Sequence, residues 1–170
     1  MQKLKFFLVL TGYQVTWLAC IFGETKFSYP FLGMIIGIIF LSIYYYFSKN
    51  KKKFLKTSVL ISVPSYLFDS LMVYFQIYEF NSIFIFGTLP LWMIVLWLSF
   101  STLFDEILVF FKNYRVLGII LSSILGPLTY YLGEPIGVLN IYDYQTFIIT
   151  MIIFWMMLMI YYLSYVIKIN

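Results

Sequence analysis

The chain is organised as long apolar runs separated by short polar or basic segments. A helix needs about 20 apolar residues to span the hydrocarbon core of a bilayer, within a range of about 17–25. Six runs approach or reach this length: residues 6–22, 30–47, 57–78, 89–111, 116–132 and 146–167. Each run is apolar on every face, and a helix satisfies its own backbone groups in lipid. We therefore expect helices rather than outer-membrane strands.

The runs and their short connections predict an all-α fold. We expect a polytopic membrane protein in which residues 1–170 form one transmembrane domain, a compact bundle of about six helices. Composition supports this fold class, because 63% of the residues are hydrophobic and only 11% are charged. Soluble domains carry about 25% charged residues, and one soluble core of this size could not cover so much apolar surface.

The basic residues predict the orientation of the bundle. With a cytoplasmic N-terminus, Lys26 alone falls outside, and the other ten Lys and Arg residues fall inside. This bias predicts that both termini are cytoplasmic. The five basic residues between Lys49 and Lys56 are interpreted as a membrane flank, and no nucleic-acid partner is expected. The ten are Lys3, Lys5, Lys49, Lys51, Lys52, Lys53, Lys56, Lys112, Arg115 and Lys168.

Asp69 is the most informative polar residue, because it lies near the middle of an apolar run. An Asp at a helix centre costs about 2.5–3.5 kcal/mol on insertion scales, so it should face the bundle interior or a wet cavity. Successive residues of a helix are 100° apart around its axis, so most polar residues of this run fall on one face, within a sector of about 60°. They are Ser58, Ser62, Ser65, Asp69 and Gln76. This face is either a substrate or proton site or a hydrogen-bonded contact between helices.

Two further candidates lie in other runs. Gln14, in the first run, would be a buried amide that needs a partner. Glu106 and Asp105 lie near the cytoplasmic end of the fourth run, where they form an interfacial acidic pair or line a cavity together with Asp69. The predicted substrate-binding residues are Asp69, Ser65, Gln76, Gln14 and Glu106.

The fifth run carries a stripe of small residues. Gly118, Ser122 and Gly126 follow at four-residue steps, a spacing that lets helices approach closely. We interpret this stripe as a helix-packing surface, with Pro127 bending the helix.

The available side chains limit the chemistry. The chain has no histidine and one cysteine, so it lacks a Ser-His-Asp arrangement and an internal disulfide. No metalloprotease, hydrolase or phosphate-loop motif is present. We therefore expect no bound metal, nucleotide or haem. The catalytic residues of any reaction are unknown. The available side chains favour a non-enzymatic role.

Several local patterns together resemble a known family. The matching segments are Gln14 and Trp17; Asp69-Ser70-Leu71; Pro90-Leu91-Trp92-Met93 with Leu96-Trp97 and Phe100; and Gly126-Pro127-Leu128-Thr129-Tyr130 with Gly133 and Gly137. Over residues 10–140 this order resembles the bacterial inner-membrane family catalogued as domain of unknown function 2878. The resemblance implies a compact multi-helix protein with no established activity. It also implies that genes of this kind often lie near genes for fatty-acid-modifying enzymes, which favours a lipid-related role.

Three functions follow as hypotheses. The first is a transport or accessory protein for a lipid or other hydrophobic substrate, with its site at Asp69 and the polar face. The second is an intramembrane lipid-modifying enzyme that uses Asp69, Glu106 and Tyr130 as acid–base groups. The third is a structural subunit of a membrane complex. The expected partners are membrane lipids and either a membrane protein or a second copy of the chain.

Overall fold

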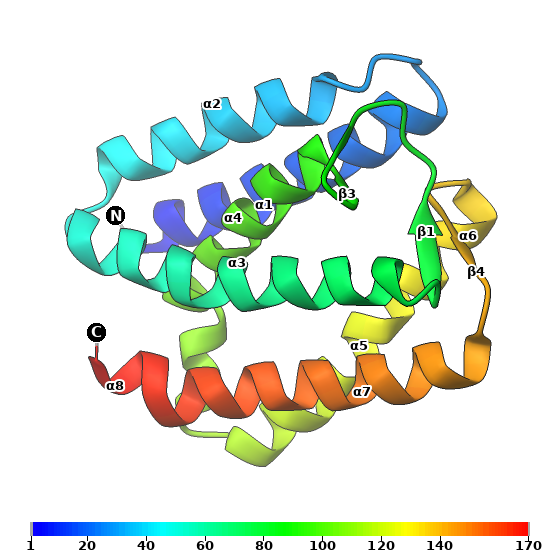
Figure 1. The fold of residues 1–170 in the computed structure, drawn as a ribbon. Coiled ribbons are helices and arrows are strands. Elements are labelled where there is room, and N and C mark those ends of the chain that lie inside the picture. Colours follow the sequence, from blue (N-terminus) through cyan, green and yellow to red (C-terminus); the bar gives the residue numbers. More distant parts are fainter. Residues whose placement is uncertain (1, 170) are drawn as a thin grey trace.

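The computed structural model describes residues 2–169, and side chains from residue 6 to residue 168. Six helices of 16 residues or more build the bundle (Figure 1). Both chain ends lie at one end of the bundle, and the opposite end carries short strands and loops. The six helices are α1 (Gln2–Thr25), α2 (Leu32–Phe47), α3 (Lys51–Tyr74), α4 (Leu91–Glu106), α5 (Arg115–Tyr131) and α7 (Tyr144–Tyr161).

Four segments are long and apolar enough to cross a membrane: Phe6–Thr25, Lys51–Tyr74, Arg115–Ile136 and Tyr144–Val166. Helices α2 and α4 have 16 residues each. At 1.5 Å per residue they are about 24 Å long, shorter than a hydrocarbon core of about 30 Å. Of the six expected spans, four therefore reach full length in the described part of the chain.

Helices α3 and α4 end before the predicted boundaries. The fourth run was expected to stay helical to residue 111, but α4 ends at Glu106 and the chain continues as a 3₁₀ helix, η1 (Leu108–Lys112). The third run was expected to reach residue 78, but α3 ends at Tyr74. Gln76 then adopts a left-handed backbone with φ 56°, which a helix cannot continue through. Apolar character indicates contact with lipid or with the core, and it does not indicate where the helical backbone stops.

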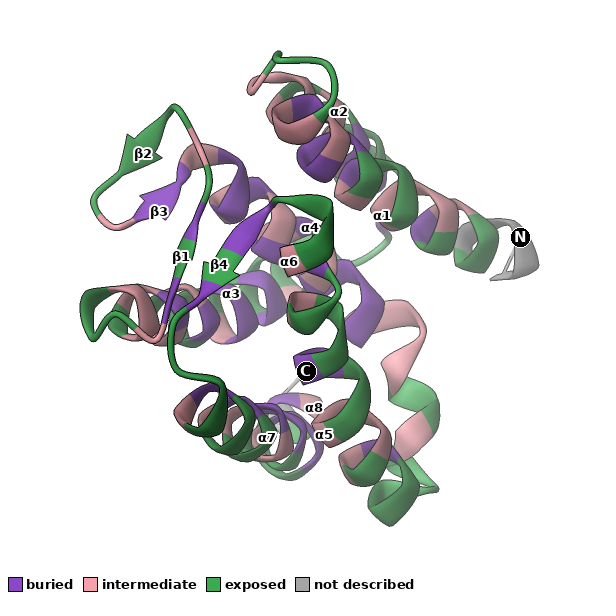
Figure 2. Ribbon diagram, turned by 90° about the vertical axis from the view of Figure 1, so that its right-hand side faces the viewer, coloured by how far each residue is buried: buried purple, intermediate pink, exposed green. Residues whose placement is uncertain are grey.

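The bundle has two halves that meet through aromatic side chains. In the first half α4 packs against α1, α2 and α3, and in the second half α5 packs against α7. Figure 2 shows α4 largely buried, whereas the outer surfaces of α5 and α7 are exposed. Across the boundary, Phe68 stacks on Phe154 with ring centroids 3.9 Å apart, and Trp97 lies 5.7 Å from Trp155.

Short strands also join the halves, which the all-α expectation did not include. Strand β1 (Tyr78–Phe80) pairs antiparallel with β4 (Leu139–Ile141), and β2 (Ile85–Phe86) pairs with β3 (Leu89–Pro90). Strands of two or three residues are too short to show an alternating pattern, and β1 and β4 lie far apart in sequence. The remaining elements are α6 (Gly133–Ile136), the π-helical turn η2 (Tyr162–Val166) and α8 (Ile167–Ile169).

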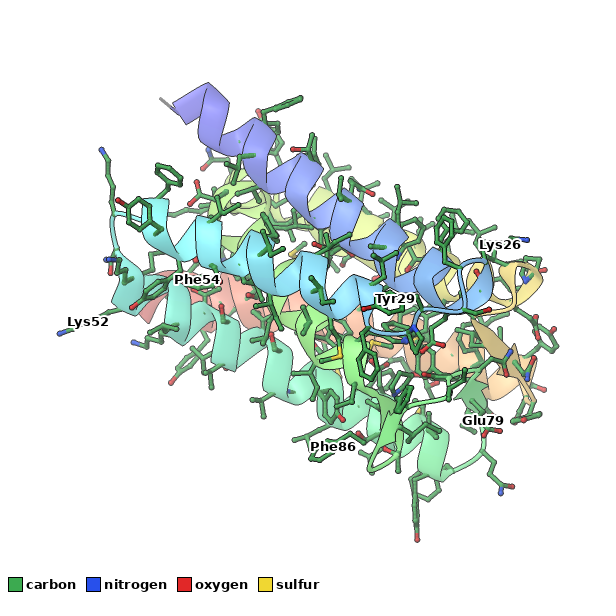
Figure 3. The ribbon with its side chains drawn as sticks, turned by 90° about the horizontal axis from the view of Figure 1, so that it is seen from above. Lys26, Tyr29, Lys52, Phe54, Glu79 and Phe86 are labelled. Atoms are coloured by element: carbon green, nitrogen blue, oxygen red, sulfur yellow. The ribbon has the colours of Figure 1, made fainter. Side chains whose placement is uncertain are left out.

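Three labelled charged residues mark the two ends of the bundle. Lys52 lies at one end, and Lys26 and Glu79 lie at the other (Figure 3). The side chains of Lys3 and Lys5 lie outside the described part of the chain. The two labelled lysines therefore occupy the opposite ends that the distribution of basic residues predicts.

Candidate functional site: a buried carboxylate behind an apolar cavity

Asp69 is fully buried in α3 and accepts hydrogen bonds from three side chains. The Tyr78 hydroxyl donates to its Oδ1 at 2.7 Å, and the Trp97 indole Nε1 donates to its Oδ2 at 2.7 Å. The Tyr130 hydroxyl lies 3.0 Å from both oxygens. The three donors belong to β1, α4 and α5, so this one carboxylate connects both halves of the bundle.

The partners of Asp69 are all neutral donors. No ion pair to Asp69 forms among the described side chains, and two phenols and one indole supply the hydrogen bonds. Burial raises the pKa of Tyr78 well above its usual range, so its hydroxyl remains a donor. A buried donor left unpaired costs about 1–3 kcal/mol, which makes this arrangement a stabilising connection between elements.

The polar face of α3 is largely as predicted. Ser58, Ser62, Ser65 and Asp69 are all buried. Ser65 donates to a carbonyl of its own helix at 2.7 Å, and Ser58 accepts from Ser101 of α4 at 2.9 Å. The face therefore meets α4 through hydroxyl groups, in addition to the carboxylate.

Gln76 and Gln14 do not join this cluster. Gln76 is exposed and lies beyond the end of α3, so its predicted place on the Asp69 face is wrong. Gln14 is also exposed, so the expectation of a buried amide is wrong. The roles of Gln14 and Gln76 as substrate contacts stay predictions.

The acidic pair of α4 forms a separate cluster. Glu106 Oε1 accepts from the Tyr44 hydroxyl at 3.0 Å. Asp105 Oδ1 accepts from the Thr57 hydroxyl at 3.0 Å and lies 3.7 Å from the Lys53 Nζ. These contacts join α2, α3 and α4 at the end of the bundle that carries the chain termini. The role of Glu106 in substrate binding stays a prediction.

A cavity of about 300 Å³ lies between α1, α4, α5 and α7. On α4 its wall runs from Trp92 to Phe104, about 18 Å at 1.5 Å per residue. All four tryptophans of the chain line it, and none of the residues that line it is charged. Trp97 and Tyr130 both line the cavity and both bind Asp69, so the carboxylate lies directly behind the wall.

The small-residue stripe of α5 contacts an aromatic side chain on α7. A Cβ at Gly126 would lie 2.2 Å from Cδ2 of Trp155, so the indole occupies the space that any side chain would need. The Ser122 hydroxyl donates to the Trp155 carbonyl at 3.3 Å. The interpretation of the stripe as a helix-packing surface is confirmed. The Trp155 Nε1 is buried and has no hydrogen-bond partner in the described part of the chain.

The sequence did not identify Tyr78, Trp97 or Trp155 as parts of this site. The residue types alone indicated which kinds of partner Asp69 could have, because a buried Asp needs hydrogen-bond donors and buried Tyr and Trp side chains usually find acceptors. With 16 tyrosines and four tryptophans in the chain, that signal selects no particular partner. The choice depends on which helices are neighbours in space.

Neither the carboxylate nor the cavity resembles a metal centre. No group of three or more Asp, Glu, Cys or His side chains converges within the part of the chain that the structure describes.

These features define a compact helical protein that has four helices able to cross a membrane, and an uncharged cavity backed by a buried carboxylate. The sequence model of the family described as "Protein of unknown function (DUF2878)" matches residues 7–161, and the chain belongs to that family. This confirms the family resemblance. No curated protein and no solved structure matches the chain.

Proposed function

We propose that the protein resides in the inner membrane of a bacterium and binds an apolar molecule taken from the bilayer, in a transport or accessory role. The observation that carries this proposal is the cavity of about 300 Å³, which is walled by apolar and aromatic side chains. Ligand pockets usually occupy about 300–1,000 Å³ and combine apolar walls with a few convergent polar groups. Tyr130 supplies such a group here, because its hydroxyl oxygen can still accept a hydrogen bond while it donates to Asp69.

The membrane assignment rests on four apolar segments of spanning length. Both chain ends lie at one end of the bundle, which fits an even number of crossings (Figure 1). Ten of the eleven basic residues belong on the cytoplasmic side if the N-terminus is cytoplasmic. Together these observations support an orientation with both termini in the cytoplasm.

A lateral entrance between α1 and α5 supports access from lipid. Helix α1 packs on α2 and α4, and α5 packs on α7, whereas α1 and α5 do not pack closely against each other. Both helices nevertheless line the cavity, through Tyr13 and Trp17 on α1 and Leu125 and Thr129 on α5. Leu125 and Thr129 are also exposed, so this wall of the cavity reaches the surface of the bundle.

The geometry favours binding over acid–base catalysis. Both oxygens of Asp69 accept hydrogen bonds from protein groups, and Glu106 is nine residues from Trp97 along α4, about 14 Å. Tyr130 lies within 3.0 Å of Asp69, but Glu106, the third group of the enzyme hypothesis, is too distant to act together with them. The enzyme hypothesis therefore has weaker support than the binding hypothesis.

Tryptophan fluorescence tests the binding proposal directly, because all four tryptophans line the cavity. Purified protein in phosphatidylcholine nanodiscs would be titrated with single-chain amphiphiles that carry bromine on the chain, since bromine quenches indole fluorescence on contact. We expect saturable quenching that an unbrominated analogue reverses.

A blocked cavity provides the control. Gly118→Leu would add bulk to the cavity wall at a position where a Cβ already meets Phe111 at 2.8 Å. It should reduce quenching, whereas Leu67→Phe on the exposed face of α3 should not. Only linear, unsaturable quenching with every chain would refute the proposal, and a stoichiometric membrane-protein partner would then favour the structural-subunit hypothesis.

A further inference from the structure

The hairpin of β2 and β3 exposes large apolar side chains. Ile83, Ile85 and Phe86 are 73%, 50% and 62% exposed. No charged residue occurs between Phe80 and Phe104, so the hairpin and the helix that follows it are free of charge. Exposed apolar side chains gathered in one segment mark a contact with a membrane or with another protein.

The hairpin lies on the flank of the bundle. The Tyr66 hydroxyl donates to the Phe86 carbonyl at 3.2 Å. Tyr66 precedes Tyr74, the last residue of α3, by eight positions, about 12 Å along the helix. Figure 3 shows Phe86 at the side of the bundle, between the end that carries Lys52 and the end that carries Glu79. The hairpin therefore lies beside the last turns of a helix that is long and apolar enough to cross a membrane.

Polar contacts hold the base of the hairpin at the end of the bundle. The Asn140 amide donates to the Asn81 side-chain oxygen at 2.9 Å, and the Ser82 hydroxyl donates to Glu24. The apolar positions begin directly afterwards, at Ile83. The chain thus passes from a polar surface at the bundle end to an apolar surface on the flank, which is the order expected at a boundary between water and lipid.

Two carbonyls of the hairpin have donors within the protein, in addition to the pairing of β2 with β3. The Phe86 carbonyl accepts from Tyr66, and the Phe84 carbonyl accepts from the Leu91 N–H at 3.2 Å. Open strand edges are not tolerated in hydrocarbon, because unpaired backbone groups are costly there. A hairpin in water would not need the Tyr66 donor, since water itself supplies one.

We propose that the β2–β3 hairpin inserts into the extracytoplasmic leaflet, at the boundary between the head groups and the acyl chains. Its partner is the upper acyl-chain region of the phospholipids, which Ile83, Ile85 and Phe86 contact. Amphipathic segments at this boundary bury their apolar face by about 5–10 Å, which agrees with a hairpin beside the last turns of α3. This inference rests on the proposed membrane location and orientation, and it is independent of the cavity ligand.

Depth-dependent quenching tests the proposal. In a Cys20→Ser background, Phe86→Cys would be labelled with a bimane fluorophore. The protein would be placed in nanodiscs of phosphatidylcholine that carries a nitroxide either near the head group or near the end of the acyl chain. We expect the shallow nitroxide to quench this probe about twofold more strongly than the deep one, because an interfacial segment reaches only about 5–10 Å into the boundary.

Two other exposed positions calibrate the depth. Glu79→Cys, at the end of the bundle, should be quenched little by either nitroxide. Val63→Cys, near the middle of α3 and 50% exposed, should be quenched more strongly by the deep nitroxide. The side chains replaced at all three labelling positions are exposed, so the labels do not disturb the core.

The hydrogen bond from Tyr66 has a test of its own. Tyr66→Phe leaves the Phe86 carbonyl without its side-chain donor, so the hairpin should move toward water. Quenching of the Phe86→Cys probe by the shallow nitroxide should then fall toward the value at Glu79→Cys. Tyr74→Phe, exposed at the end of the same helix, is the matched control and should leave the quenching unchanged.

The outcomes separate the hairpin from the membrane location. Quenching at Phe86→Cys as weak as at Glu79→Cys, while Val63→Cys is quenched, overturns the lipid contact and favours a protein-docking surface. Stronger quenching of Phe86→Cys by the deep nitroxide also overturns the interfacial position. Weak quenching at all three positions overturns the membrane location together with the hairpin proposal.

Discussion

The Tyr130 hydroxyl lies 3.0 Å from both carboxylate oxygens of Asp69, although the two residues are 61 positions apart in the sequence. Asp69 belongs to the α1–α4 half of the bundle, and Tyr130 belongs to the α5–α7 half. The contact also joins a fully buried polar group to the wall of the cavity. One hydrogen-bonded pair therefore links the assembly of the bundle to its candidate site.

Asp69→Asn should destabilise the folded protein. An Asn keeps one acceptor oxygen and replaces the other with a donor group, so at least one of the donors Tyr78, Trp97 and Tyr130 loses its partner. We expect a loss of about 1–3 kcal/mol in the free energy of unfolding, measured as a lowered midpoint in detergent.

Ser70→Ala is the control for Asp69→Asn. Among the described residues its hydroxyl bonds the Tyr66 carbonyl alone, in the preceding turn of the same helix, so its loss should change stability by less than about 0.5 kcal/mol. If Asp69→Asn were as stable as Ser70→Ala, and ligand binding alone were lost, the carboxylate would serve the ligand rather than the fold.

Gly126→Ala should disturb the contact between α5 and α7. The new methyl group would lie 2.2 Å from Cδ2 of Trp155, and the rigid indole cannot yield without moving its helix. Overpacking of this kind costs about 1–3 kcal/mol. Gly133→Ala is the matched control, since its Cβ would meet nothing closer than 3.5 Å. Equal unfolding midpoints for the two variants would contradict the close approach at Gly126.

Single-cysteine labelling should reveal the orientation. In a Cys20→Ser background, Glu79→Cys should react with an impermeant maleimide in intact cells, and Lys52→Cys should react only after lysis. Both positions are exposed and lie at opposite ends of the bundle (Figure 3). The reverse pattern would place both termini outside.

Asp143 should make the start of α7 sensitive to acid. Its carboxylate accepts from the Thr146 backbone N–H at 3.1 Å, and hydrogen bonds from Thr146 lower the pKa of Asp143. A lowered folded-state pKa contributes stability above the unfolded pKa of about 3.9, and this contribution is lost as pH falls through the folded value.

Substitutions at Asp143 separate the effect of its charge on stability from the effect of its helix-capping hydrogen bond. Asp143→Asn retains a capping side chain and should remove this part of the pH dependence, whereas Asp143→Ala should lower stability at every pH. Unfolding midpoints at about pH 7 and about pH 3 measure both effects. Identical acid sensitivity in the native protein and Asp143→Asn would exclude a contribution from this carboxylate.

The sequence by itself determined the features that depend on the chain's own composition and local spacing. Apolar runs of spanning length indicated the helices, because lipid requires a long apolar surface and internally satisfied backbone groups. The spacing of Ser58, Ser62, Ser65 and Asp69 indicated the buried face of α3, because a helix of known pitch fixes which residues share a side. Gln76 fell outside this face because helical spacing assumes a helix that in fact ends at Tyr74.

Only the tertiary structure decided which groups meet. The donors to Asp69 come from β1, α4 and α5, and the β1–β4 pairing joins residues about 60 positions apart. The cavity lies where α4 faces α5 and α7 across large aromatic side chains, and where α1 and α5 do not pack closely against each other. These relationships depend on the relative placement of distant helices. Local periodicity carries no information about that placement, since each apolar run could bury the same surface against several different neighbours.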